Sequence, residues 1–153
     1  KWGIVNIKNK KKDFKPLINA RLETIDEKVS FKKLIKLQRC VAVADGFYEW
    51  KRVEKEKTPY YFLREDKKLI YIAGIYEEDQ FCMITEEASP NVTEIHHRQP
   101  VILNESDVNK YLNIEISGSD YLNHFQKSKL SFYEISKDVN KPTNNNISLI
   151  QPL

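Results

Sequence analysis

The sequence predicts an α+β fold: a twisted, partly closed antiparallel sheet with a barrel-like core and short peripheral helices. Short apolar and aromatic runs, typical of strands, alternate with polar turns along most of the chain, and only a few segments carry helix caps. The chain has 153 residues, of which 41% are hydrophobic, and this is enough for one domain with a core of its own. We therefore expect a single domain over residues 1–153, with a flexible tail at 141–153.

The expected elements are short. The first helix begins at the N-cap Ser30 and ends near Leu37. The expected strands are runs of apolar, β-branched or aromatic residues: 40–44, 47–50, 59–63, 69–75, 81–85, 99–103 and 130–136. The polar turn 64–68 predicts a hairpin between the two strands that flank it. Two more helices are expected, at 105–112 and at 121–125.

Composition narrows the class of protein. The formal net charge of +3 is mild and does not by itself indicate binding to nucleic acid. No apolar run approaches the roughly 20 residues that cross a bilayer, so we expect no membrane partner. The lysine-rich run 8–15 is either a solvated loop or a surface that faces phosphates, and both interpretations stay open. Cys40 and Cys82 lie in apolar runs, which favours two free thiols over a disulfide.

Motifs for metals and cofactors do not stand out in the sequence. The three histidines are not accompanied by a CxxC or HExxH pattern. His96 and His97 are adjacent, and in an extended segment they would point to opposite faces and could not share one ion. There is no G-x-S-x-G nucleophile turn, and the four glycines lie too far apart for a phosphate loop. We therefore expect no metal site and no cofactor.

The run 39–52 raises the question of chemistry, because Glu49 lies between Tyr48 and Trp50 in an aromatic segment. Aromatic neighbours would partly desolvate this carboxylate and raise its pKa toward the range useful for proton transfer. His96 could act as a second acid or base, or hold a developing charge. The alternatives are that Glu49 pairs with a neighbouring basic residue and that His96 is a hydrogen-bonded core histidine.

Five blocks that occur in a fixed order resemble the SRAP family, the SOS-response-associated peptidase-like proteins that sense abasic sites. These blocks are Trp2-Gly3-Ile4, Asn19-Ala20-Arg21-x-Glu23-Thr24, Arg39-Cys40-x-x-x-Ala44-Asp45-Gly46-Phe47-Tyr48-Glu49-Trp50, Ala73-Gly74-Ile75-Tyr76-Glu77 and Ile95-His96-x-Arg98-x-Pro100-Val101-Ile102-Leu103. The resemblance covers the chain from Trp2 to about Asn140. It implies a single SRAP-like domain.

The resemblance also implies a reaction. In this family the α-amine of an N-terminal cysteine attacks the ring-opened aldehyde of an abasic site to form a Schiff base. The thiol of the same cysteine then closes a thiazolidine ring and leaves a DNA–protein crosslink. By this resemblance Asn19 positions the amine, Glu49 moves protons, and His96 assists at the Schiff-base stage and in reversal.

The resemblance to the SRAP family also implies a partner, which is single-stranded DNA that contains abasic sites. We expect the protein to bind this DNA as a monomer. Trp2 and Gly3 would lie beside the flipped-out sugar, while Arg21 and Arg98 would hold the flanking phosphates. The full expected DNA-binding set is Trp2, Gly3, Arg21, Tyr48, Trp50, Thr85 and Arg98. A cytoplasmic, nucleoid-associated location is expected for a bacterial or phage protein, and a nuclear one for a eukaryotic protein.

Three departures from the family pattern qualify these expectations. The sequence begins at the Trp-Gly block, so we expect the segment with the nucleophilic cysteine to lie upstream and the 153 residues alone not to crosslink DNA. Residues 5–8 replace the usual Ile-Pro-x-Trp, and Gln99 stands where Met or Arg is common, which puts two groove contacts in doubt. The resemblance implies crosslinking and lyase activity, with peptidase activity on the protein itself. Two alternatives remain: a catalytically inactive single-stranded-DNA binding module, or an autoprocessing peptidase.

Overall fold

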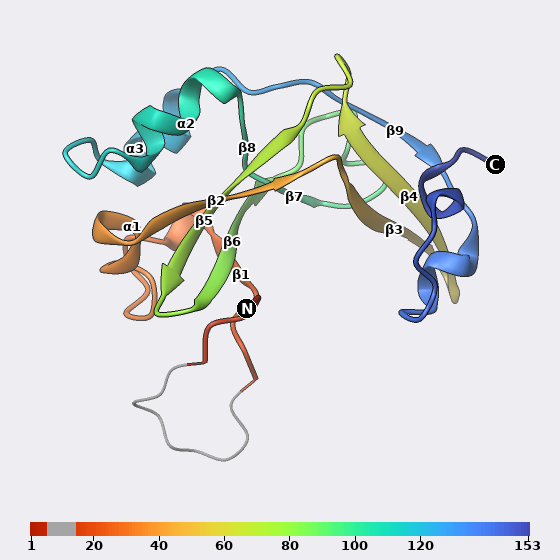
Figure 1. Ribbon diagram of the computed structural model, residues 1–153, viewed down its shortest axis with the longest axis horizontal. Helices are drawn as coiled ribbons and strands as arrows, with labels where there is room; N and C mark the ends of the chain where they lie inside the picture. Colours follow the sequence, from red (N-terminus) through yellow and green to blue (C-terminus); the bar gives the residue numbers. More distant parts are fainter. Residues whose placement is uncertain (6–14) are drawn as a thin grey trace. The chain divides into compact units, whose positions relative to one another are not determined.

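The computed structural model describes residues 1–5 and 15–153, so most of the lysine-rich run 8–15 lies outside the described residues. The chain forms two compact units (Figure 1). Unit 1 comprises Lys1–Val43, Tyr71–Glu86 and Pro100–Lys127, and unit 2 comprises Ala44–Ile70, Glu87–Gln99 and Ser128–Leu153. Sheets combined with a few short helices confirm the α+β class. The expectation of a single domain stays a prediction.

Most residues of a six-stranded sheet belong to unit 1. Its main path runs β1 (Asn19–Arg21), β6 (Gln80–Glu87), β5 (Ile70–Glu77) and β2 (Arg39–Ala44). The short strands β7 (Arg98–Pro100) and β8 (Ile102–Leu103) pair with β6 and β5 respectively. Because β1 is parallel to β6 whereas β5 and β6 are antiparallel, the sheet is mixed. Its path ends at β1 and β2 without closing, so the sheet is open where the sequence predicted a partly closed antiparallel one.

Short helices pack against this sheet within unit 1. They are α1 (Leu34–Leu37), α2 (Glu105–Leu112) and α3 (Gly118–His124), preceded by the 3₁₀ turn η1 (Leu22–Thr24). Apolar side chains from the helices and from β1, β5 and β6 form one buried cluster. Tyr111 of α2 is fully buried in it, and its hydroxyl donates to the Gly74 carbonyl oxygen at 2.7 Å. This bond ties α2 to the centre of β5.

Unit 2 is built on a three-stranded antiparallel sheet. β3 (Phe47–Val53) and β4 (Glu56–Arg64) form a hairpin, and β9 (Leu130–Glu134) pairs with the other edge of β4. The hairpin turn places Glu54 at a φ of +53°. Phe47, Phe62 and Phe132 stack across the three strands with ring centroids 5.0 Å apart at each step. The sheet therefore has a phenylalanine face, and the residues that alternate with these occupy the opposite, tyrosine face.

The tyrosine face carries Tyr48, Tyr61 and Tyr133, whose rings are 5.5 and 5.9 Å apart. The C-terminal segment reaches this face through two 3₁₀ turns, η2 (Lys137–Asn140) and η3 (Ile147–Ile150). The Tyr133 hydroxyl donates to the Ile150 carbonyl oxygen at 2.7 Å, and Leu149 is buried. The flexibility expected of 141–153 stays a prediction, which hydrogen exchange of these amides would measure.

Two expectations about the elements are corrected. The hairpin predicted across 64–68 is wrong, because β4 belongs to the three-stranded sheet and β5 to the six-stranded one. Turn residues indicate where the chain reverses but not which strand it pairs with. The last helix is α3 and begins earlier than expected, because the Ser117 side chain caps it by accepting from the Asp120 amide. Cys40 and Cys82 are both free thiols.

Candidate active site

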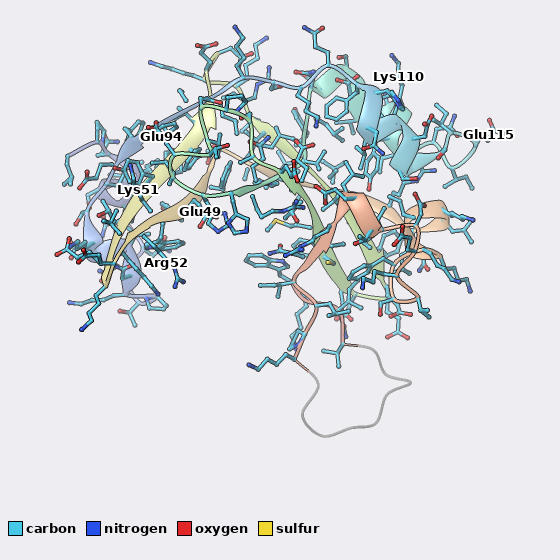
Figure 2. The ribbon with its side chains drawn as sticks, turned by 180° about the vertical axis from the view of Figure 1, so that it is seen from behind. Glu49, Lys51, Arg52, Glu94, Lys110 and Glu115 are labelled. Carbon is cyan, nitrogen blue, oxygen red and sulfur yellow. The ribbon has the colours of Figure 1, made fainter. Side chains whose placement is uncertain are left out.

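Glu49 and His96 meet in unit 2. Glu49 projects from the middle of β3 (Figure 2), and its Oε2 lies 3.7 Å from Nδ1 of His96. The other carboxylate oxygen, Oε1, accepts from the Trp50 backbone N–H at 3.0 Å. About a third of each side chain is exposed, 27% for Glu49 and 32% for His96. In the described part of the chain no ion pair joins Glu49 to Lys51 or Arg52, so the carboxylate faces the imidazole instead.

The main chain of Arg98 holds the His96 ring at Nδ1. This nitrogen lies 3.0 Å from the Arg98 carbonyl oxygen and accepts from the Arg98 backbone N–H at 3.2 Å. The Glu49 carboxylate is the third polar group that faces Nδ1. Both tautomers of the ring find a partner here, because a protonated Nδ1 donates to the carbonyl oxygen and an unprotonated one accepts from the N–H.

The side chains of Tyr48 and Trp50 do not surround Glu49 and His96. The expectation that these two aromatic rings desolvate the Glu49 carboxylate is therefore corrected. Successive residues of a strand point to opposite faces, so Glu49 lies on the phenylalanine face whereas Tyr48 and Trp50 lie on the tyrosine face. Tyr48 packs on Tyr61, and Trp50 donates through Nε1 to the Asn140 side-chain oxygen at 2.8 Å. The interpretation from sequence treated neighbours in the chain as neighbours in space.

The residue that does face Glu49 across the sheet is Tyr60, which sequence analysis did not identify. Tyr60 is directly opposite Glu49 in the register of β3 and β4. Burial raises the pKa of its hydroxyl, with further contributions from Glu134 and Glu94. Cross-strand neighbours in such a pair bring their Cβ atoms to about 5 Å. The register of the hairpin was the signal that could have revealed Tyr60.

His97 also differs from the sequence expectation. The imidazole rings of His96 and His97 have centroids 4.5 Å apart and an interplanar angle of 39°, so they do not point to opposite faces. The reason is that both residues lie in a loop rather than in a strand. Within residues 1–5 and 15–153, however, there is no cluster of three or more histidine, cysteine, aspartate or glutamate side chains that could hold a metal ion.

The remaining candidate residues lie together in unit 1 along the parallel pair of β1 and β6. Arg21 is in register with Thr85, and Asn19 is two residues before Arg21 on the same face of β1. Ala20, which alternates with them, is fully buried in the core. Asn19 and Arg21 therefore point away from the core, and both are exposed. We call the set Trp2, Gly3, Asn19, Arg21 and Thr85 the β1–β6 face.

Trp2 and Gly3 join this face through β6. Trp2 bridges Phe81 and donates from its indole nitrogen to the Ile18 carbonyl oxygen at 2.9 Å, yet 51% of the residue is exposed. Gly3 adopts a φ of +105°, and a Cβ at this position would lie 2.8 Å from the Pro16 Cβ. Glycine is therefore required for the chain to reach β6 at this angle. The indole is held by its edge while its ring remains open to solvent.

Arg98 contributes its main chain to the His96 site, as described above, and its side chain is only half-buried. Its role in phosphate binding, like the DNA-binding and catalytic roles of the β1–β6 face, stays a prediction. No helix in the described residues is long and apolar enough to cross a membrane.

The fold of this chain is similar to α+β folds in solved structures of bacterial proteins. A crystal structure of a protein from Bacteroides thetaiotaomicron matches with a TM-score of 0.77 and 30% identity, over 88% of this chain and 65% of that one. A phage-related protein from Bordetella bronchiseptica matches with a TM-score of 0.71 and 25% identity, over 89% of this chain and 70% of that one. The protein family is identified by comparison of the sequence with known families.

The family described as SOS response associated peptidase (SRAP) matches residues 1–142, and the chain belongs to this family. The abasic site processing protein YoqW of Bacillus subtilis is 34% identical over 99% of this chain and 74% of its own length. An abasic site processing protein of Saccharomyces cerevisiae is 33% identical over the whole of this chain but only 46% of its own length. The chain thus spans between about half and three quarters of these relatives.

Proposed function

We propose that this protein processes abasic sites in single-stranded DNA and forms a covalent crosslink to them through an N-terminal cysteine. The observation that carries the proposal is the Glu49–His96 pair, 3.7 Å apart, in a chain whose relatives are named abasic site processing proteins. A carboxylate at this distance can stabilise a positively charged imidazolium, and the pair can act in proton transfer once bound substrate brings the two groups within hydrogen-bond distance.

The proposed chemistry conserves atoms and needs no redox partner. The cysteine α-amine adds to the aldehyde carbon of the ring-opened sugar, and the resulting carbinolamine loses water to give a Schiff base. The thiol sulfur then attacks the imine carbon, its proton passes to the nitrogen, and the thiazolidine ring closes. The sum is amine, thiol and aldehyde giving thiazolidine and one water. Each stage moves a proton, so an acid–base group beside the reacting carbon accelerates it.

Glu49 and His96 divide this work according to their geometry. The His96 ring is oriented by the main chain of Arg98, and it can accept a proton from the reacting groups. Glu49, 3.7 Å away, stabilises the imidazolium that then forms. In the direction of crosslink reversal the imidazolium returns the proton.

DNA binding is proposed for the β1–β6 face and Arg98. Trp2 offers an exposed indole ring on which an unpaired base can stack, and Arg21 offers an exposed guanidinium for a phosphate. Asn19, two residues from Arg21, is proposed to position the reactive amine. The DNA contacts of Tyr48 and Trp50 remain part of the proposal, although these two side chains lie on the tyrosine face, where Tyr48 packs on Tyr61 and Trp50 donates to Asn140.

Three finer expectations accompany the proposal. Peptidase activity would be limited to removal of the residue that precedes the cysteine, and lyase activity would follow from Schiff-base formation. The protein is expected to act as a monomer. Since its substrate would be cellular DNA, we expect it inside the cell.

The test is a denaturing gel of the full-length protein incubated with single-stranded DNA that carries one abasic site. We expect a heat-resistant crosslink, absent with intact DNA of the same sequence. Glu49→Gln should slow its formation on the order of 10²-fold, whereas Glu115→Gln, at an exposed carboxylate of unit 1 (Figure 2), serves as the matched control and should not. Binding to the abasic strand without any crosslink would favour the inactive binding module and overturn the catalytic proposal.

A further inference from the structure

The His96 ring is held by the residues that follow it, which makes its position dependent on the start of β7. Its Nδ1 lies 3.0 Å from the carbonyl oxygen of Arg98 and 3.2 Å from the backbone nitrogen of Arg98. The imidazole can therefore keep its direction only if the backbone of Arg98 is fixed. The neighbouring side chain, Gln99, is 7% exposed and was singled out by the sequence only as a departure from the family pattern.

Gln99 closes the loop that carries His96. Its Oε1 accepts from the Ser89 backbone N–H at 2.9 Å and lies 3.0 Å from the Ser89 hydroxyl. Beside it, the Ala88 N–H donates to the His97 carbonyl oxygen at 3.1 Å. Two adjacent sets of hydrogen bonds thus hold the base of the loop. One joins the backbones of Ala88 and His97, and the other joins Ser89 to the Gln99 side chain.

A continuous series of hydrogen bonds leads from Gln99 to the amide of His96. The Ser89 carbonyl oxygen accepts from the amides of Val92 and Thr93, at 2.9 and 3.0 Å. The Val92 carbonyl oxygen in turn accepts from the His96 amide at 3.1 Å. Val92 is fully buried, so this turn cannot shift without opening the core of unit 2.

The same network is anchored to β9. The Ser89 hydroxyl has one proton and two acceptors in reach, Gln99 Oε1 and the Asn91 side-chain oxygen at 2.9 Å. The Asn91 amide donates to the Leu130 carbonyl oxygen at 2.8 Å, at the first residue of β9. The loop is therefore fastened both to the segment that holds the His96 ring and to the sheet that presents Glu49.

From these contacts we infer that Gln99 is a positioning residue: by accepting from Ser89 it fixes the loop so that Nδ1 of His96 faces Glu49 and the Arg98 carbonyl. The inference rests on the proposed function for its catalytic consequence. A neutral amide suits this position, because it is a buried acceptor that leaves no charge to compensate. Methionine has a similar length and fills the volume, but it leaves the Ser89 N–H without that acceptor.

The first measurement does not depend on catalysis. Long-range ¹H–¹⁵N spectra of the histidine rings should show one dominant tautomer for His96 in the wild type, and Gln99→Met should convert this signal to a mixture of tautomers. Gln80→Met is the matched control, because Gln80 accepts the Val5 amide at 2.7 Å in unit 1 and its loss should leave the His96 signal unchanged.

The second measurement is kinetic. At saturating abasic DNA, Gln99→Met should slow crosslink formation about tenfold with little change in DNA affinity, because a misplaced acid–base group affects the chemical step. Equal rates in wild type and Gln99→Met, with one unchanged His96 tautomer, would overturn the inference.

If Gln99→Met does not fold, the wild-type protein still decides the question. The Ser89 amide should exchange with solvent as slowly as the Ala88 amide, because both close the base of the loop. Rapid exchange at Ser89 beside a protected Ala88 would show that Gln99 does not hold the loop. If the wild-type protein forms no crosslink but Gln99→Met still changes the His96 tautomer signal, the proposed function is refuted and this inference is not.

Discussion

Replacing Gly46 by alanine should destabilise the protein strongly, because the β2–β3 connection leaves no space for a Cβ. A Cβ at this position would lie 2.2 Å from the Phe62 carbonyl oxygen and 2.5 Å from the Tyr61 ring. The carbonyl belongs to the backbone of β4, so it cannot rotate away as a side chain could. The start of β3 must then separate from β4 at the Phe47–Phe62 pair.

The magnitude follows from the cost of inserting a methyl group into packed structure. Overpacking of this kind costs about 1–3 kcal/mol, and a contact with backbone places Gly46→Ala near the upper end, about 3 kcal/mol. For a protein of this size that corresponds to a decrease in Tm of roughly 6–12 °C. Urea unfolding followed by circular dichroism measures the free energy directly.

The control for Gly46→Ala is Val53→Ala, at an exposed position at the end of the same strand, 59% exposed. It should change the free energy of unfolding by no more than about 0.5–1 kcal/mol. The reasoning fails if Gly46→Ala unfolds at the same urea concentration as the control.

Three further outcomes are expected. Tyr111→Phe should cost about 1–3 kcal/mol in urea unfolding, because the buried Gly74 carbonyl loses its donor; an unchanged midpoint would contradict this. Affinity for single-stranded DNA should fall with salt, and Arg21→Ala should reduce the log–log slope by about 0.7 if it holds one phosphate; an unchanged slope removes Arg21 from the interface. Burial raises the pKa of Cys40 from 9.0 to about 11, so the folded state keeps its proton longer than the unfolded state does. The resulting stabilisation is complete below pH 9 and is lost between pH 9 and 11, and Cys40→Ala should flatten that part of the stability curve; an equal slope in both proteins refutes the assignment.

The strands of unit 2 could be predicted from the sequence because their residues carry strong strand propensities. The aromatic run at Phe47–Val53 and the run around Pro59 both became strands. Their partners could not be predicted, since pairing is decided by packing over long separations in the chain. The polar turn after β4 therefore suggested a hairpin with β5 that does not exist.

In the candidate site, too, some residues could be predicted from local sequence and others could not. The sequence singles out Glu49 as a carboxylate in an aromatic run and His96 in a short polar stretch before a buried strand, and the structure brings these two together. The two-residue period of a strand places Tyr48 and Trp50 on the face opposite to Glu49. Tyr60 and Gln99 could not be found from local pattern, because their places depend on the register of the hairpin and on closure of the loop.

The central claim is that Glu49 and His96 act as one proton-transfer unit, and a double-mutant cycle tests it most directly. Single-turnover rates of crosslink formation at saturating abasic single-stranded DNA would be measured for wild type, Glu49→Gln, His96→Ala and the double variant. Residues that act as a unit are non-additive, so the double variant should be little slower than the slower single one. Multiplied effects, with each substitution slowing the reaction by the same factor in either background, would contradict the account.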